Sequence, residues 1–198
     1  MDVGALERQA TDNQDVARAL SVAREYSGRQ EARKAEAVLR LILSGHPEHP
    51  EALHELGVIA LRSGRPELAV PLLQRAVAGA PDLWTYHSNL GVACRAVGRQ
   101  TEALAAYREA LRLNPQSPAC HHNVANLLRQ TGDLDEAVAH YRQALAANPD
   151  YHPPRLPLAE ILHGAGRTAE ARRELKAIPA TAPEAKAAAE ALARMGNG

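Results

Sequence analysis

Hydrophobic positions along this chain recur at the three- and four-residue spacing of amphipathic helices. They fall into pairs of blocks: a first block of about fourteen residues, then a short break, then a second block that starts directly after it. Alanine, leucine and arginine dominate both kinds of block, and these residues lose little conformational freedom in a helix. The pattern therefore predicts an all-α chain built from helix-turn-helix units.

The paired blocks repeat with a period of 34 residues. In residues 84–117 the recurring places hold Leu90, Gly91, Cys94, Gly98, Ala103, Tyr107, Ala110 and Pro115. Adding or subtracting 34 finds comparable residues at these places without a gap. The five copies are residues 16–49, 50–83, 84–117, 118–151 and 152–185.

Turn residues mark the boundaries inside each copy. Four copies place a glycine between their two helices (Gly64, Gly98, Gly132 and Gly166), where a tight turn requires left-handed backbone. The first copy has Gln30 there, which predicts a short first helix or a long turn. Pro66 and Asp133 are expected to open second helices, as a first-turn proline and an N-cap. Prolines close the first four copies, at Pro47, Pro81, Pro115 and Pro149.

The recurring residues resemble the signature of tetratricopeptide repeats. That signature has small residues at the eighth and twentieth places, a large apolar residue at the twenty-fourth and proline at the thirty-second. The resemblance covers roughly residues 16–185. It implies an α-solenoid, a right-handed superhelix of five stacked repeats whose first helices line a concave groove. Bacterial arrays like those of O-linked N-acetylglucosamine transferases are the most similar in character.

The two ends of the chain depart from the repeat. Residues 1–15 are expected to form a short leading helix or to be disordered. Thr181–Glu184 has the pattern of a capping box, which predicts a C-terminal capping helix that stops at Gly196. This helix and tail, residues 181–198, overlap the end of the fifth repeat, and Pro179 is expected to shorten the helix before them. Since the chain begins with Met1 and ends beyond a capped helix, we expect it to be complete.

Charge and composition exclude several classes of function. Lys and Arg total 23 and Asp and Glu total 23, whereas a general nucleic-acid binder normally has a basic excess. The N-terminus is not a secretory signal, and no apolar run reaches the ~18 residues of a membrane helix, which predicts a cytoplasmic protein without membrane insertion. There is no nucleophile elbow, phosphate loop or HExxH motif, so we predict no enzyme activity and no cofactor.

Neither the cysteines nor the histidines are interpreted as metal ligands. Cys94 and Cys120 lie at packing places of predicted helices and are expected to be small core residues. Histidines cluster at positions 46, 49 and 54 and again at 121 and 122, but no cysteine or carboxylate joins them at metal-ligand spacing. We therefore interpret them as loop or surface residues and predict no metal site.

Candidate binding residues follow from the places that face the groove in such repeats. Asparagine offers one acceptor and two donors, which suits capture of a peptide backbone unit, and arginine can bind a carboxylate through two parallel hydrogen bonds. The predicted peptide-binding residues are His54, Arg62, Asn89, Arg95, His122, Asn123, Asn126 and Arg129. Asn89 and Asn123 occupy equivalent places, as do Arg95 and Arg129. An extended peptide with acidic side chains or a free C-terminus would fit this set.

The main functional hypothesis is a protein-interaction scaffold or adaptor that binds a peptide or partner protein in the groove. One alternative is the repeat segment, or an accessory subunit, of a glycosyltransferase or sulfotransferase system, because residues 56–77 resemble such arrays closely. Another alternative is a self-assembling scaffold that associates through its loose first repeat. The partner's identity cannot be read from the fold, because function depends on the site and not on the fold.

Overall fold

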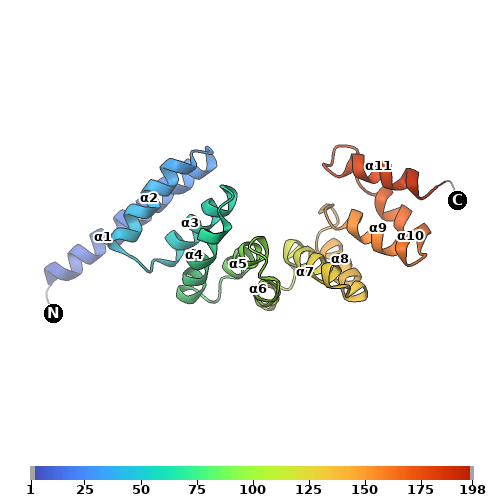
Figure 1. The fold of residues 1–198 in the computed structure, drawn as a ribbon. Coiled ribbons are helices and arrows are strands. Elements are labelled where there is room, and N and C mark those ends of the chain that lie inside the picture. Colours follow the sequence, from blue (N-terminus) through green and yellow to red (C-terminus); the bar gives the residue numbers. More distant parts are fainter. Residues whose placement is uncertain (1–2, 197–198) are drawn as a thin grey trace. The chain divides into compact units, whose positions relative to one another are not determined.

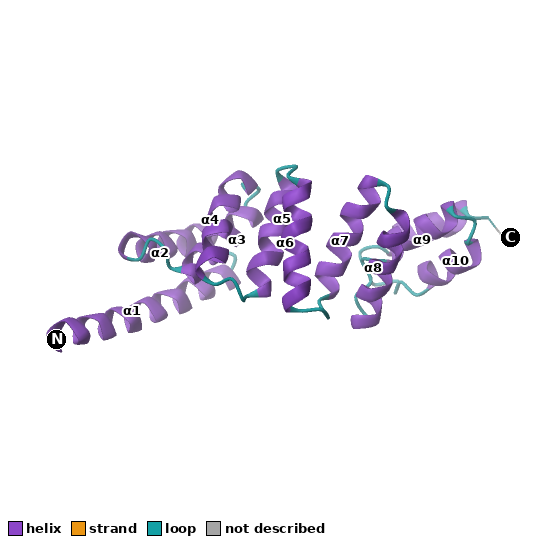
Figure 2. Cartoon of the chain, turned by 90° about the horizontal axis from the view of Figure 1, so that it is seen from below, coloured by secondary structure: helices purple, strands orange, loops and turns teal. Residues whose placement is uncertain are grey.

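The structure, a computed structural model, describes residues 3–196, with side chains from residue 13 onward. These residues form eleven helices and no strand (Figures 1 and 2). The helices are α1 Val3–Gly28, α2 Ala32–Gly45, α3 Pro50–Arg62, α4 Pro66–Gly79, α5 Trp84–Ala96, α6 Gln100–Leu113, α7 Pro118–Thr131, α8 Leu134–Ala147, α9 Arg155–Gly164, α10 Thr168–Lys176 and α11 Ala185–Arg194. The chain divides into two compact units, residues 1–106 and 107–198.

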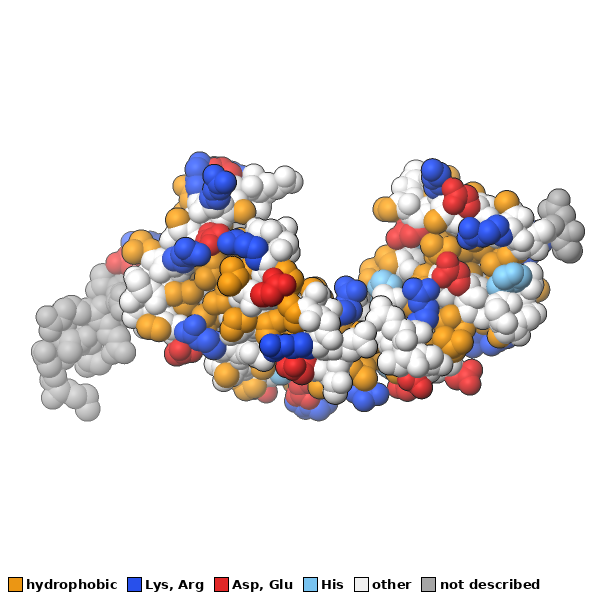
Figure 3. All heavy atoms as spheres, viewed as in Figure 1, with side chains coloured by type: hydrophobic (Ala, Val, Ile, Leu, Met, Phe, Trp, Pro, Cys, Tyr) orange, Lys and Arg blue, Asp and Glu red, His pale blue; other side chains and the backbone are white. Residues whose placement is uncertain are grey.

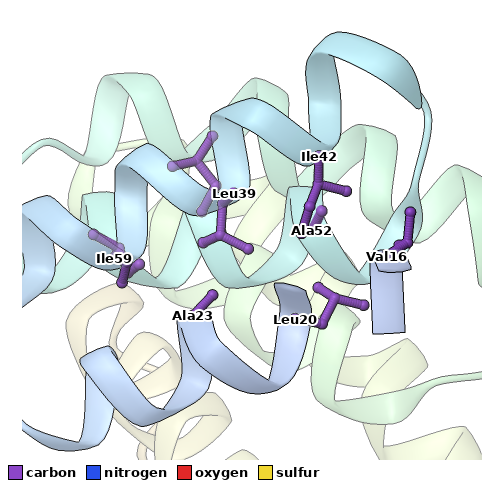
Figure 4. Packing of buried hydrophobic residues seen from close by; sticks show 9 residues of the cluster. Val16, Leu20, Ala23, Leu39, Ile42, Ala52 and Ile59 are labelled. Carbon is purple, nitrogen blue, oxygen red and sulfur yellow. The ribbon is translucent and has the colours of Figure 1, made fainter. Parts of the chain in front are cut away.

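Unit 1 is a stack of helix pairs. Helices α1 and α2 pack together, as do α3 and α4, and α2–α3 and α4–α5 join the successive pairs. Its main core gathers side chains from three helices, including Leu20 of α1, Leu39 of α2 and Ile59 of α3 (Figure 4). Each pair therefore buries its apolar face against the next, as a repeat that cannot bury that face alone requires.

Close packing inside the second repeat depends on Gly57. A Cβ atom at this position would lie 2.7 Å from Cγ of Leu73, which projects from α4 and is fully buried. Real Cβ atoms essentially never approach a carbon so closely. The small residue thus lets α3 and α4 approach, as the sequence predicted, and Leu73 fills the space against it.

The turns between paired helices confirm the glycine prediction. Gly64, Gly98, Gly132 and Gly166 have φ angles between 67° and 92°. The first pair differs from the prediction, because α1 is 26 residues long and only three residues separate it from α2. The expectation of a short helix or a long turn was wrong: Gln30 itself takes the left-handed conformation, with φ 61°, and keeps the same turn geometry.

Unit 2 continues the same arrangement. Helices α7 and α8 pair, α9 and α10 pair, α8 contacts α9, and α11 packs on α10. Its largest fully buried side chains include Tyr107, Tyr141 and Leu158. Helix α10 is only nine residues long and ends before Pro179, as expected, whereas α8 has fourteen residues.

Helix ends follow the sequence in part. Pro66 opens α4, and the prolines that close the first four copies each lie two residues past a helix end. Asp133 occupies the N-cap position of α8, but its side chain makes no capping bond and instead accepts a hydrogen bond from Thr131 Oγ1 at 2.6 Å. The predicted capping box at Thr181 was wrong, because α11 begins only at Ala185 after turns over residues 179–184.

Membrane-crossing segments are absent from the part of the chain described. None of the helices in residues 3–196 combines the length and the hydrophobicity that a bilayer-spanning helix needs.

Candidate functional site

The eight predicted binding residues all lie on the first helices of repeats. His54 and Arg62 lie on α3, and Asn89 and Arg95 on α5, all in unit 1. Unit 2 carries the other four on α7: His122, Asn123, Asn126 and Arg129. Since Asn89 and Asn123 belong to different units, the predicted ladder between them stays a prediction. Each unit presents its own cluster.

The unit-1 cluster joins α3 to α5 through one imidazole ring. His54 stacks on the Tyr86 ring, with ring centroids 4.1 Å apart and an angle of 12° between the ring planes. Asn89 Nδ2 donates a hydrogen bond to His54 Nε2 over 2.8 Å. This bond requires Nε2 to be an acceptor, so the neutral ring carries its proton on Nδ1. Asn89 therefore supports a neighbouring side chain and does not present a fully free amide.

Electrostatics keep this cluster neutral at its centre. Burial lowers the pKa of His54 to about 4, so the ring is uncharged near neutral pH. Burial also raises the pKa of Tyr86, with Glu55 acting in the same direction and Arg24 in the opposite one. Beside them, Arg24 of α1 forms an ion pair with Glu51 of α3. The surface thus has a neutral aromatic centre next to a charge-paired border.

Acid is expected to destabilise the protein through His54. Its ordinary pKa is 6.5 and its folded-state pKa is about 4, so the unfolded chain takes up the proton first. The stability that neutral His54 contributes is present above about pH 6.5 and is lost as the pH falls through about 4. We expect the urea midpoint to fall across this window, and to fall less steeply in His54→Gln, which can still accept from Asn89 but does not titrate. Equal pH dependence in both proteins would contradict the assignment.

The unit-2 cluster is a directed chain of four side chains. Tyr141 Oη donates to Asn126 Oδ1 at 2.6 Å, and Asn126 Nδ2 donates to His122 Nε2 at 3.1 Å. His122 must then carry its proton on Nδ1, which lies 3.2 Å from Tyr151 Oη and donates to it. Burial raises the pKa of Tyr141 to about 12 and also raises that of Tyr151. The amide of Asn126 is therefore already hydrogen-bonded, and its bond to Tyr141 links α7 to α8.

Free polar groups remain at other predicted positions. Arg62 and Arg95 are exposed, and neither forms an ion pair with a described side chain. Asn123 is half-buried, and its amide makes no hydrogen bond within the described residues. Arg129 differs, because its Nη1 lies 2.9 Å from Glu160 Oε2 of α9. Figure 3 shows histidine, basic and acidic side chains among hydrophobic ones over α7–α9.

A set of hydrogen bonds to turn carbonyls escaped the sequence interpretation. His87 Nε2 donates to Pro81 O at 2.7 Å, His121 Nε2 to Pro115 O at 3.0 Å, and Arg155 Nη2 to Pro149 O at 3.0 Å. The signal was present, because these donors recur every 34 residues, six residues after a closing proline. Reading His121 as a surface residue was therefore wrong: it is 8% exposed and braces the turn between repeats.

The remaining chemistry-bearing side chains are structural in character. Cys94 and Cys120 are free and buried, as predicted, and burial raises the pKa of the Cys94 thiol. Within residues 13–196, no group of three or more His, Cys, Asp or Glu side chains is arranged to hold a metal ion.

Comparison with solved structures places the fold among known helical arrays. The chain is similar to MamA, with a TM-score of 0.73 and 19% identity over 87% of this chain and 97% of that chain. It is also similar to pilF of Pseudomonas aeruginosa (TM-score 0.77, 20% identity, 84% and 76% covered). A thermophilic TPR protein of Thermus thermophilus aligns with a TM-score of 0.68 and 24% identity, covering 91% and 98%. These likenesses establish the fold class, an all-α solenoid.

Family models give the closer assignment. No curated protein matches the sequence. Models described as tetratricopeptide repeat match residues 10–83, 84–117, 106–139 and 128–195. Together these matches run without interruption from residue 10 to residue 195. The chain belongs to the tetratricopeptide repeat family.

Proposed function

We propose that this protein is an interaction scaffold that binds an extended, acidic peptide segment of a partner protein on the α3–α5 face of unit 1. This face comprises His54, Arg62, Tyr86, Asn89 and Arg95. The observation that carries the proposal is the contrast among the arginines. Arg129 is already paired with Glu160, whereas Arg62 and Arg95 are exposed without an ion-pair partner among the described residues.

The α3–α5 face offers two kinds of contact side by side. The stacked His54 and Tyr86 rings provide a neutral, largely buried base between the two helices. Arg62 is the last residue of α3, and Arg95 lies in the last turn of α5. Both arginines thus lie nearer the C-terminal ends of their helices than the contact between His54 and Asn89. An unpaired arginine can take a carboxylate bidentately, which favours a peptide with Asp, Glu or a C-terminal carboxylate.

A peptide-display selection tests this proposal. The full chain is screened against a randomised peptide library, and selected peptides are measured by fluorescence anisotropy. We expect enrichment of acidic residues, and a loss of about tenfold in affinity for each of Arg62→Ala and Arg95→Ala, because hydrogen bonds to charged groups contribute about 1.5–3 kcal/mol. Binding should also weaken as salt rises.

Matched variants separate this face from the rest of the chain. Arg18→Ala combined with Arg33→Ala removes two exposed arginines elsewhere in unit 1 and should leave affinity unchanged. Asn123→Ala tests whether the corresponding α7 face in unit 2 takes part in peptide binding. Selected peptides with no acidic preference, or equal binding by the Arg62→Ala/Arg95→Ala protein, would overturn the assignment. The alternatives of an accessory subunit for a glycosyltransferase system and of self-assembly stay predictions.

A further inference from the structure

A pocket lies on unit 2, between the C-terminal part of α6 and helices α7 and α8. Its volume is about 620 Å³. The polar side chains that line it are Arg108, Arg112, Gln116, His121, His140 and Gln143. Within this described part of the chain, no Asp or Glu belongs to the lining. The lining therefore presents hydrogen-bond donors and two arginines, and the carboxylates of Glu109 and Glu136 that pair with these arginines lie next to it.

Two imidazole rings meet inside the pocket. His121 Nε2–H donates to Pro115 O, which leaves His121 Nδ1 as an acceptor. That nitrogen lies 2.9 Å from His140 Nδ1, so His140 must hold the proton between them. His140 Nε2 then carries a lone pair, 3.8 Å from Glu136 Oε1. A further proton taken up by the pair would therefore add to His140 Nε2. The hydrogen bond between His121 Nδ1 and His140 Nδ1 would stay intact.

The two arginines belong to one face of α6, because residues four apart in a helix are neighbours. Arg108 lies 3.7 Å from Glu136, and Arg112 lies 2.8 Å from Glu109. The Arg108–Glu136 pair is long and solvent-exposed, so an anion in the pocket can recruit that guanidinium group at small cost. Arg112 holds Glu109 through hydrogen bonds from both Nε and Nη2, so an anion competes with Glu109 for this second guanidinium group. The same two positive charges oppose a metal cation at the imidazole pair.

Burial, more than the surrounding charges, disfavours an extra proton on His140. Burial and then His121 lower the pKa of His140; Glu136 acts in the opposite direction, and Arg108 in the same direction as burial. A doubly negative group bound beside the ring would reverse this balance, because an opposite charge nearby favours the protonated form.

We propose that this pocket binds a phosphate-type dianion together with one proton, which is taken up by the His121–His140 pair. Arg108 and Arg112 donate to the anion's oxygens, with the Gln116 and Gln143 amides as neutral donors. The proton comes from solvent and adds to His140 Nε2. The protein part of the complex therefore carries one more positive charge than the empty protein. This site is separate from the α3–α5 face and does not depend on the proposed peptide binding.

Sulfate is the first probe, because it stays doubly charged across the pH range in which histidine titrates. Calorimetric titration of the full chain is done at about pH 6 and about pH 8. We expect sulfate affinity to be weaker at the higher pH. If binding raises the pKa of His140 by about one, the loss approaches but does not exceed about tenfold, because the full factor is reached only when the lower pH lies below both pKa values. Inorganic phosphate and phenyl phosphate then identify the source: tighter binding of the monoester indicates a phosphoryl group attached to a larger ligand, and equal binding indicates the free ion.

Variants decide whether the pocket is the site. Arg108→Ala/Arg112→Ala should weaken sulfate binding about tenfold or more at both pH values, whereas Arg18→Ala/Arg33→Ala, with the same loss of charge, should not. His140→Gln should keep weaker binding but lose its pH dependence, and sulfate should shift the His140 imidazole ¹⁵N signals in the wild type. Sulfate binding that is independent of pH, or equal in the two double-arginine variants, would overturn the proposal.

Discussion

Replacing Tyr141 with alanine is expected to lower the free energy of unfolding by about 3–5 kcal/mol, the largest effect we predict for a single substitution. Tyr141 is fully buried and among the largest side chains in the core of unit 2. Its ring fills the space between α7 and α8, and its hydroxyl donates to Asn126 Oδ1. Alanine would leave a cavity and also remove the first donor of the chain that orients Asn126 and His122.

Urea denaturation followed by circular dichroism measures this effect, and two variants divide it. Tyr141→Phe keeps the ring and removes only the hydroxyl, so we expect about 1 kcal/mol, the low end for an unpaired group, because Asn126 is only half-buried. Leu134→Ala in the same helix removes a side chain that is 43% exposed and should change stability by about 0.5 kcal/mol or less. If Tyr141→Ala were as mild as Leu134→Ala, Tyr141 would not be a core residue.

The second large effect concerns the joint between α3 and α4. Leu73→Ala should destabilise unit 1 by about 2–5 kcal/mol, because the fully buried Leu73 side chain packs directly against Gly57. Gly57→Ala should also destabilise, by about 1–3 kcal/mol, since its Cβ would lie 2.7 Å from Leu73 Cγ. This result runs against propensity, because alanine ordinarily stabilises a helix interior by about 1 kcal/mol over glycine.

A double variant and a control make this prediction specific. The cost of Gly57→Ala/Leu73→Ala should be smaller than the sum of the two single costs, because Leu73→Ala makes room for the added Cβ and that Cβ fills part of the space left by the leucine. Gly45→Ala, at the end of α2, has no atom within 4 Å of its added Cβ and should be neutral or slightly stabilising. Additive costs in the double variant would show that Gly57 and Leu73 do not share the joint.

Two buried tyrosines, Tyr141 and Tyr86, also hold candidate binding residues in place. The Asn126 amide is oriented by the hydroxyl of Tyr141, and the hydrogen bonds continue from Asn126 to His122 and Tyr151. In unit 1, Tyr86 supports His54 by stacking on its ring. Asn89 and Asn126 are therefore hydrogen-bonded to neighbouring rings, whereas Arg62 and Arg95 have no ion-pair partner among the described residues.

Sequence alone determined the repeat, its turns and most helix ends, because these depend on local chemistry. Left-handed turns select glycine, closing prolines stop helices, and a 34-residue period of small and large residues specifies which faces pack, as at Gly57 and Leu73. Local signals were less reliable at two positions. Gln30 adopted the left-handed turn without being glycine, and at Asp133 another partner competed, because its side chain accepts from Thr131 instead of capping α8.

Only the tertiary structure decided which polar side chains are already occupied. Spacing places His54, Asn89, Asn126 and Arg129 on the right helices, but their partners are Tyr86, His122, Tyr141 and Glu160, which come from other helices or other turns. The pairing of His121 with His140 likewise joins two helices across the pocket in unit 2. A hydrogen bond depends on distance and direction between side chains, and a one-dimensional pattern of residue types carries neither.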